Sequence, residues 1–362
     1  MAFEETRFSY QTDELLFEGV RGSIGREIRR WRLLARAARR FDVVHFNFGH
    51  SIFPQAELTA GGPLGRRIVR AYQRALELRD LPLLRALGRG IAVTYQGDDA
   101  RQGDVCRSRY PITFATEVDG DYYTPAGDER KRWRIGQVAR FAHRIYSVNP
   151  DLLNVLPPSA EFVPYASVDP REWRVSDVVP GSAKTAVVMH APTHRAVKGT
   201  RFIVDAVERL RSEGCAIDLR LVEGVPHAES RRLYAQADLV IDQLLAGWYG
   251  ALAVECMAMG RPVVCYVRDE DLHHIPRAMR DELPMIRSAP DTIYDVLKSW
   301  LTTRRAALAD RGRLGRAYME RWHDPIEIAS RLRDDYAAMV PGTASDAPER
   351  AVARRRVPAP TA

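Results

Sequence analysis

Short β-branched runs alternate with amphipathic helical patterns along most of the chain, and this alternation constrains the fold more than any other feature. The expected strands are residues 41–48, 90–97, 143–149, 161–166, 184–191, 217–224, 237–243 and 261–267. A helix expected at 200–214 ends at Gly214 and has one apolar face, made of Phe202, Ile203, Ala206, Val207 and Leu210. This order of elements predicts an α/β protein built from doubly wound domains.

The length of 362 residues predicts two domains. We expect an N-terminal Rossmann-like domain, a linker rich in proline and polar residues, a C-terminal Rossmann-like domain, a C-terminal helix and a disordered tail, at 1–165, 166–183, 184–322, 323–340 and 341–362. A doubly wound domain normally opens with a strand, a glycine-rich turn and a helix, whereas the first convincing strand here begins near Phe41. We therefore expect the N-terminal domain to be truncated or irregular at its start.

Composition narrows the class of protein. The chain has no run of eighteen apolar residues and its N-terminus is too charged for a signal peptide, so we expect a cytoplasmic protein. The spacing of Cys106, Cys215, Cys256 and Cys265 predicts neither a disulfide framework nor a zinc site. A formal net charge of +7 leaves a polyanionic partner open.

Two helix entrances in the second half follow expected strands and carry groups suited to phosphate. Arg195 and Lys198 precede Gly199 at the first, and the second reads Gly-Trp-Tyr-Gly at 247–250, ahead of a helix that contains Glu255. Free N–H groups and the helix dipole attract anions, and both entrances should lie at the carboxyl edge of one sheet. Glu255 then lies about a turn and a half along its helix, within reach of a ribose. The alternatives are solvated loop cations and a carboxylate satisfied by a neighbouring backbone group or arginine.

Several segments of the second half resemble a known family. Residues 190–210 and 234–264, "APDTIYDVL" and "HDPIEIASRLRDDY" look like the C-terminal half of the GT-B fold glycosyltransferases of family 4, the large retaining group. The resemblance covers residues 161–337 and is looser over the first half. It implies a GT-B fold with two Rossmann-like domains facing a cleft, and a C-terminal helix that returns to the first domain.

The resemblance also implies roles for the donor site. Lys198 and Arg195 would grip the diphosphate of a nucleotide-sugar donor, with Gly199 at the helix mouth, and Glu255 matches the second of two family glutamates, which handle the sugar and the ribose. The first glutamate falls on Gly247, so the residue that normally contacts the transferred sugar is missing. Backbone N–H groups of the turn formed by Trp248, Tyr249, Gly250 and Ala251 remain to contact sugar and phosphate.

The first half is expected to bind the acceptor. The segment "VTYQGDDARQGD" resembles a family loop in which Gln96 stands at a histidine position; glutamine would position the reacting groups but cannot shuttle a proton. Asp98 or Asp99 could accept the acceptor's proton, or serve only as capping aspartates of a surface turn. Arg101 follows in the same loop, and after another strand Asn47 and His50 face the same cleft, although a lone loop histidine is more often structural. These last two and Arg101 are the expected acceptor-binding residues.

Two patterns have the spelling of a metal site, but their context does not favour one. Asp119 and Asp121 have the Asp-x-Asp spelling, but they lie in a Gly/Tyr-rich loop. His190 and His194 have zinc-pair spacing, but Pro192 between them prevents a shared helical face. We expect no metal and no other cofactor, because cations and helix mouths can neutralise the charge of the leaving diphosphate.

Arginine-rich helices are expected at 25–41 and 64–90. In the first, Ile28, Trp31, Leu34, Ala35 and Ala38 lie along one side, so the helix could lie on anionic lipid at the inner face of a membrane, as the resemblance implies for users of lipid-linked acceptors. The alternative is a pair of solvated helices that cover the sheet. Nucleic acid is not expected as a partner, because no binding module is present.

The predicted function is a retaining, metal-independent glycosyltransferase that moves a sugar from a nucleotide-diphosphate donor to a glycan, lipid-linked or natural-product acceptor. Two alternatives fit the same scaffold. A nucleotide-sugar epimerase would turn over the donor without an acceptor. A non-catalytic GT-B subunit is suggested by Gly247 and Gln96 at the two family positions and by the irregular start.

Overall fold

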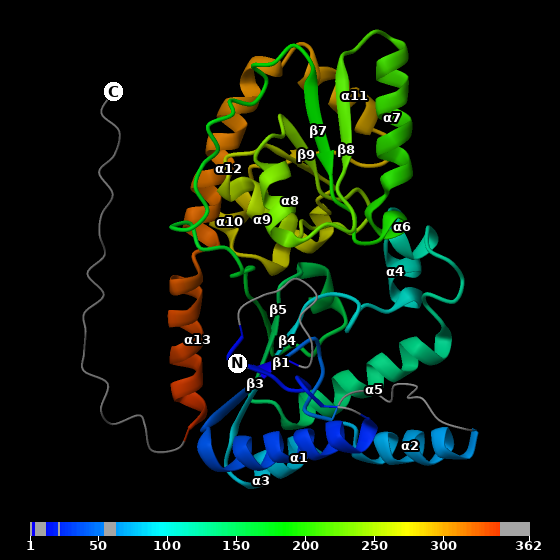
Figure 1. The fold of residues 1–362 in the computed structure, drawn as a ribbon, viewed down its shortest axis with the longest axis vertical. Helices are drawn as coiled ribbons and strands as arrows, with labels where there is room; N and C mark the ends of the chain where they lie inside the picture. Colours follow the sequence, from blue (N-terminus) through cyan, green and yellow to red (C-terminus); the bar gives the residue numbers. More distant parts are fainter. Residues whose placement is uncertain (1, 4–11, 21, 54–62, 341–362) are drawn as a thin grey trace, which may run out of the picture.

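The two larger β-sheets of the molecule, of four and five parallel strands, lie one above the other along its long axis (Figure 1). The computed structural model describes residues 2–3, 12–20, 22–53 and 63–340. Each sheet is flanked by helices, and a segment without helix or strand, residues 163–185, runs between them. The tail expected to be disordered, 341–362, lies outside the described residues.

The first sheet has the order β3-β4-β5-β6 and is parallel throughout. Its strands are β3 Val43–Asn47, β4 Gly90–Tyr95, β5 Arg144–Ser147 and β6 Ala160–Phe162. Its helices are α1 Ser23–Arg40, α2 Pro63–Leu76, α3 Asp80–Ala86, α4 Gly103–Arg109 and α5 Pro125–Phe141, with 3-10 turns η1 Phe114–Thr116 and η2 Pro150–Asn154. A separate parallel pair, β1 Ala2–Phe3 and β2 Glu14–Leu15, precedes them.

The second sheet has the order β11-β10-β9-β7-β8 and is also parallel. Its strands are β7 Ala186–His190, β8 Ile217–Leu221, β9 Leu239–Ile241, β10 Val263–Cys265 and β11 Ile286–Arg287. Its helices are α6 Arg195–Lys198, α7 Thr200–Ser212, α8 His227–Tyr234, α9 Ala251–Ala258, α10 Arg277–Asp281, α11 Ile293–Leu301 and α12 Leu308–Trp322, with η3 Asp269–His274 and η4 Arg305–Ala307. These elements form the doubly wound α/β architecture that the sequence predicts.

The last helix, α13 Pro325–Met339, lies beside the first sheet although it follows the second in sequence (Figure 1). Asp324 caps its first turn by accepting the Ile326 N–H at 2.8 Å, and Pro325 occupies the first helical position, where a missing N–H has no consequence. The Asp335 carboxylate accepts the Tyr146 hydroxyl of β5 at 2.7 Å, and Tyr336 bonds to His45 of β3. The chain therefore crosses from one sheet to the other twice.

The side of α1 on which the sequence places Ile28, Trp31 and Leu34 is divided in the structure between the core and the solvent. Leu34 packs into the core, but Ile24, Ile28 and Trp31 are 78%, 48% and 44% exposed. The face of α1 that packs against the first sheet is centred on Leu34 and Ala37. An apolar stripe of Ile24, Ile28 and Trp31 is left facing solvent among arginines.

Candidate functional site

Lys198 and the start of α9 meet at the carboxyl edge of the second sheet, around Asp242. This aspartate follows β9 directly and is fully buried. One of its carboxylate oxygens accepts the Lys198 ammonium at 3.0 Å, and the other accepts the Gly250 N–H at 2.6 Å. The two entrances expected from the sequence therefore do converge, but the anion between them is a side chain of the protein.

The Lys198 ammonium has a second fixed partner. It donates to Gln243 Oε1 at 2.8 Å, so two of its three N–H donors are used. Gly199 allows the chain to turn directly after it: its φ of +74° lies in the left-handed region, and a Cβ there would lie 3.2 Å from Leu244. Lys198 is thus fixed by its backbone on one side and by two acceptors on the other.

Arg195, the second expected cation, is held elsewhere. Its guanidinium bonds to the Glu223 carboxylate, with the closest N–O distance 2.5 Å, and its side chain is 62% exposed. Arg195 and Lys198 sit at opposite ends of the one-turn helix α6. The structure brings Lys198 to the α9 entrance and leaves Arg195 at the surface.

The side chains of the Gly-Trp-Tyr-Gly entrance point into the core. Trp248 and Tyr249 are 1% and 0% exposed, and the Tyr249 hydroxyl bonds to His323 Nε2 at 2.9 Å. Gly247 has a φ of +83°, and a Cβ at that position would overlap the Arg268 guanidinium. The space above Gly247, where the family glutamate would stand, is therefore filled by an arginine to which no sequence motif points.

Glu255 lies on the buried face of α9 and has a specific partner. Its Oε1 is 3.0 Å from His227 Nε2, at the first residue of α8. This hydrogen bond raises the pKa of His227 above its ordinary value, against the opposing effect of burial. The neighbour that satisfies Glu255 is thus a histidine.

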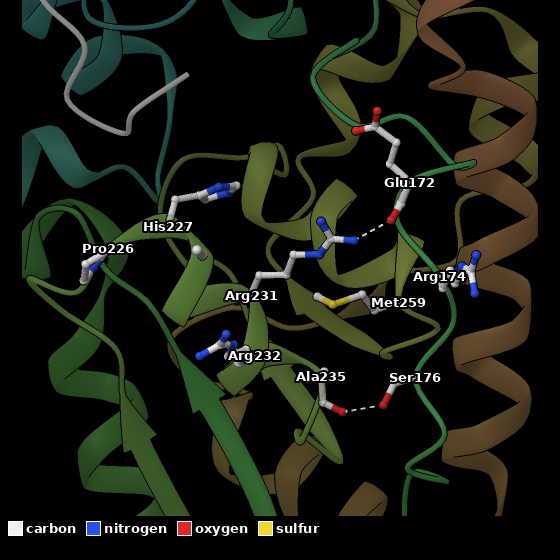
Figure 2. A pocket seen from close by; sticks show the side chains of 10 residues that line it. Glu172, Arg174, Ser176, Pro226, His227, Arg231, Arg232, Ala235 and Met259 are labelled. Carbon is white, nitrogen blue, oxygen red and sulfur yellow. Dashed lines mark hydrogen bonds between the residues drawn. The ribbon is translucent and has the colours of Figure 1, made fainter. Parts of the chain in front are cut away.

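A cavity of about 650 Å³ begins at His227 and runs between α8 and residues 172–176 (Figure 2). Its lining is rich in basic groups and consists of Glu172, Arg174, Ser176, Pro226, His227, Ala228, Arg231, Arg232, Ala235 and Met259. Arg231 stacks over the Trp173 ring at 4.2 Å and donates to the backbone oxygen of Glu172 at 2.5 Å. The cavity adjoins Glu255 through His227.

In the first domain, the structure brings Gln96 and Asn47 together. Asn47 is the last residue of β3 and Gln96 directly follows the neighbouring β4, and Gln96 Nε2 donates to Asn47 Oδ1 at 3.4 Å. Asp99 accepts the backbone N–H groups of Gln96 and Gly97, the latter at 2.6 Å, so this carboxylate caps the turn. Burial raises the pKa of Asp99. The pKa of His50 is lowered, mainly by burial and to a smaller extent by the positive charge of Arg134.

Asp98 and Arg101 are also engaged. Asp98 accepts the hydroxyls of Tyr122 and Tyr123, each at 2.5 Å. Arg101 donates to the Asp151 carboxylate at 2.6 and 3.1 Å. The side chains of Asp98, Asp99 and Arg101 are therefore all bonded to other groups of the protein.

A chain of hydrogen bonds connects this loop to the entrance of α9. Asn149 donates to the Gln96 carbonyl at 2.5 Å and accepts the Tyr165 hydroxyl at 3.1 Å. His323 donates from Nδ1 to the Tyr165 carbonyl at 2.8 Å and bonds to Tyr249 through Nε2. The loop after β4, the chain between the sheets, the residue between α12 and α13, and the α9 entrance are therefore linked.

The two domains also meet at a buried ion pair. Arg268 and Asp271 are 3.0 Å apart, and Asp271 accepts the Tyr110 hydroxyl at 3.1 Å and Asn154 Nδ2 at 2.8 Å, both from the first half of the chain. Arg268 stacks over Tyr110 at 3.6 Å and donates to the Ile112 carbonyl at 3.0 Å. These contacts of Arg268 and Asp271 with the first domain, called the seam below, lie directly beside Gly247.

The residues of the two metal-like patterns have other partners or surroundings. His190 bonds to the Ile241 carbonyl and to Thr200, while His194 caps α6. Asp119 and Asp121 lie in an exposed loop. Within 12–20, 22–53 and 63–340, no group of three or more His, Cys, Asp or Glu side chains is placed to hold a metal ion. No helix within these ranges is long and apolar enough to cross a membrane.

No protein-family model matches the sequence, and no curated protein matches it. Solved structures do match. HepE from Anabaena, in complex with UDP-glucose, has a TM-score of 0.53 at 12% identity, over 88% of this chain and 84% of that chain. Sucrose-phosphate synthase from Thermosynechococcus elongatus has a TM-score of 0.55 at 14% identity, over 86% of this chain and 78% of that chain. WaaG, a glycosyltransferase involved in lipopolysaccharide biosynthesis, has a TM-score of 0.51 at 13% identity, over 87% of this chain and 96% of that chain.

This chain has the GT-B fold. The fold expected from the sequence is thus confirmed. Gln96 follows β4 of the first sheet, and Lys198 and Gly250 lie at the carboxyl edge of the second sheet. Ligands of open α/β sheets bind at this edge. Three residues there were missed: Asp242, His227 and Arg268. Asp242 alone carried a signal, since it is an acid directly after an apolar strand.

Proposed function

We propose that this protein is a glycosyltransferase of the family 4 type, which transfers a sugar from a nucleotide-diphosphate donor. The observation that carries the proposal is the convergence of Lys198 and the α9 entrance, with Glu255 about 7.5 Å further along the same helix. A diphosphate at the entrance would place its ribose near that carboxylate. The UDP-glucose complex of the similar HepE supports a nucleotide-sugar donor.

Free donors remain for a diphosphate beside Asp242. Lysine carries three N–H donors, of which Lys198 uses two, and the first turn of a helix has N–H groups without intrahelical partners. Gly250, Ala251 and Leu252 are half-buried, whereas residues 253–258 of α9 are buried. Asp242 would hold Lys198 and the Gly250 N–H in place while the remaining donors bind phosphate.

The proposed chemistry is retaining and metal-independent. Lys198 and the dipole of α9 would stabilise the leaving diphosphate, and the acceptor would attack from the same face of the sugar. Gln96 and Asn47 would position the acceptor, a glycan, lipid-linked or natural-product alcohol. Proton NMR of the product's anomeric centre tests retention, and unchanged turnover in EDTA tests metal independence.

A thermal-shift panel of UDP, GDP, dTDP and ADP tests the donor site. We expect one nucleotide to raise the melting temperature. Lys198→Ala and Glu255→Gln should weaken its binding about 10- to 100-fold, because the first removes a charged donor and the second replaces a charged acceptor by a neutral one. Lys298→Ala, an exposed lysine of α11, is the matched control and should respond as the parent does. Equal responses from all four proteins would refute the proposed donor site.

A non-catalytic GT-B subunit is the second candidate, favoured by Arg268 in the space above Gly247. Incubation with UDP- and GDP-sugars, alone and with a lipid extract, separates the candidates. Transfer to an acceptor supports the transferase, and nucleotide binding without turnover supports the partner subunit. Sugar isomerisation without an acceptor would instead indicate an epimerase.

We also propose that α1 contacts an anionic membrane surface. The exposed Ile24, Ile28 and Trp31 follow the 4,3 spacing of one helical stripe, and Arg29 and Arg32 flank them. Co-sedimentation with phosphatidylglycerol vesicles should exceed that with phosphatidylcholine vesicles. Ile28→Glu should abolish the difference, whereas Leu314→Glu, at an exposed apolar residue of α12, should preserve it. Equal binding to both vesicles would contradict the proposal.

A further inference from the structure

The pair formed by His227 and Glu255 has a geometry that the proposed donor site does not yet explain. Glu255 is 7% exposed, and its Oε1 faces His227 Nε2 at 3.0 Å, while its Oε2 accepts no hydrogen bond from the described residues. A carboxylate has two oxygens. When one of them is bonded to a fixed donor, that bond also sets the direction in which the other oxygen points. His227 is itself restrained, since its ring lies 5.8 Å from the buried Trp173 ring.

We infer that His227 is a positioning residue for the ribose, and that it holds the Glu255 carboxylate so that its second oxygen receives the ribose hydroxyls. This inference rests on the proposed function. The histidine is the first residue of α8 and lines the cavity (Figure 2). The glutamate lies on α9, so the bond between them joins two helices beside the cavity. A nucleotide lying along α9 from Gly250 would meet this pair before it reaches Met259.

The charges around His227 make the pair responsive to pH. Glu255 faces it from α9, Arg231 from its own helix, and Glu172 and Arg174 line the cavity from the chain that joins the sheets. The hydrogen bond to Glu255 raises the pKa of His227, while burial and Arg231 act in the opposite direction. Below the raised pKa an imidazolium donates to the carboxylate; above it the donor is neutral and the bond is weaker.

Affinity for a ribonucleotide should therefore fall as pH rises through the raised pKa of His227. We expect a change of about fivefold, the typical difference between a charge-assisted and a neutral hydrogen bond. Nucleotide sugars are suitable probes because their diphosphate diesters do not titrate in this range. Glu255 contacts the ribose, so the effect should appear in the preference for ribose over 2′-deoxyribose.

The test measures dissociation constants by calorimetry between pH 5.5 and 8.5 for UDP-glucose, GDP-glucose and ADP-glucose, each beside its 2′-deoxy counterpart. The parent should prefer the ribose form, more strongly at low pH. H227Q, whose amide can donate but not titrate, should keep a preference that is flat with pH. H227A should lose the preference, and H273Q, at an exposed histidine of η3, should match the parent.

The outcomes separate the two proposals. If H227A and H227Q show the parent's preference and pH profile, the pair is only a structural bridge between α8 and α9 and the inference is wrong. If the parent binds none of these nucleotide sugars at any pH, the proposed function fails and the inference fails with it. Should H227A not fold, the flat profile expected for H227Q decides the matter.

Discussion

Asp242 is the residue on which the proposed donor site depends, because three backbone segments meet at its carboxylate. It joins the end of β9 to the Lys198 ammonium and to the N–H of Gly250, the N-cap residue of α9. Its side chain is fully buried, and that of Lys198 is 14% exposed. Removing one partner of a buried pair leaves the other charge uncompensated, which is far more damaging than losing an exposed ion pair.

Asp242→Ala should lower the free energy of unfolding by about 3 kcal/mol. Asp218→Ala, which removes the half-exposed pair with Arg220, should cost less than about 1 kcal/mol. Urea denaturation of both variants measures the difference. Equal, small effects would mean that Asp242 does not organise the entrance of α9.

Gly247 is required for two reasons that a matched glycine separates. Its φ of +83° disfavours a side chain, and a Cβ would also overlap Arg268. Gly214 has a φ of +87°, but a Cβ there would meet nothing within 4 Å, so it carries only the first penalty. Gly214→Ala should destabilise by about 1 kcal/mol and Gly247→Ala by at least about 2 kcal/mol more, measured by denaturation. Similar values for both would show that Arg268 moves aside freely.

Sequence reasoning located the two helix entrances of the proposed site, because they follow local rules. Lys198, Gly250 and Glu255 were predictable because a helix entrance after a strand has a known polarity. The partners of these residues were not predictable, since the pairings of Lys198 with Asp242 and of Glu255 with His227 join residues 44 and 28 positions apart. Arg268 could not have been found from Gly247 alone, because its position depends on the seam between the domains.

At the scale of elements, the entrance of α9 depends on the junction between α12 and α13. His323 occupies this junction, fully buried, and joins the Tyr165 carbonyl to the Tyr249 hydroxyl. Burial lowers the pKa of His323 to about 4. The histidine is therefore neutral in the folded protein under conditions in which the unfolded chain begins to protonate it.

The sign of the resulting pH dependence follows from proton linkage. Between the unfolded pKa of about 6.5 and the folded value of about 4, the unfolded chain binds more protons, so stability falls as pH falls through this window. His323→Gln should flatten this part of the stability curve, by at most about 3 kcal/mol at pH 4. His273→Gln, at the exposed surface, is the control. An unchanged slope in His323→Gln would contradict the burial argument.

Strands were more predictable than helix faces. The eight expected strands are all present, within a few residues at each end, because β-branched runs bounded by turns are a local signal. The two-residue strands β1, β2 and β11 were missed, since so short a run has no period. The sequence grouped Leu34 with Ile28 and Trp31 on one side of α1, whereas Leu34 is buried and the other two are exposed, because an apolar stripe and the face toward a sheet need not coincide.

At the scale of the whole molecule, the two domains are joined by a seam as well as by the chain. Asp271 is fully buried and receives hydrogen bonds from Arg268, Tyr110 and Asn154. Asp271→Ala should leave Arg268 uncompensated and loosen the seam, which small-angle scattering would record as a larger radius of gyration. Asp269→Ala, on an exposed pair of the same turn, should leave the scattering unchanged. Identical curves for both variants would show that the seam is held by other contacts.

A crystal structure with the nucleoside diphosphate that stabilises the protein most is the direct test of the proposed donor site. We expect a diphosphate at the α9 entrance beside Lys198 and Gly250, with the ribose hydroxyls on Glu255. A nucleotide bound elsewhere, or a Glu255 carboxylate that remains on His227 alone and does not touch the ribose, would contradict this proposal.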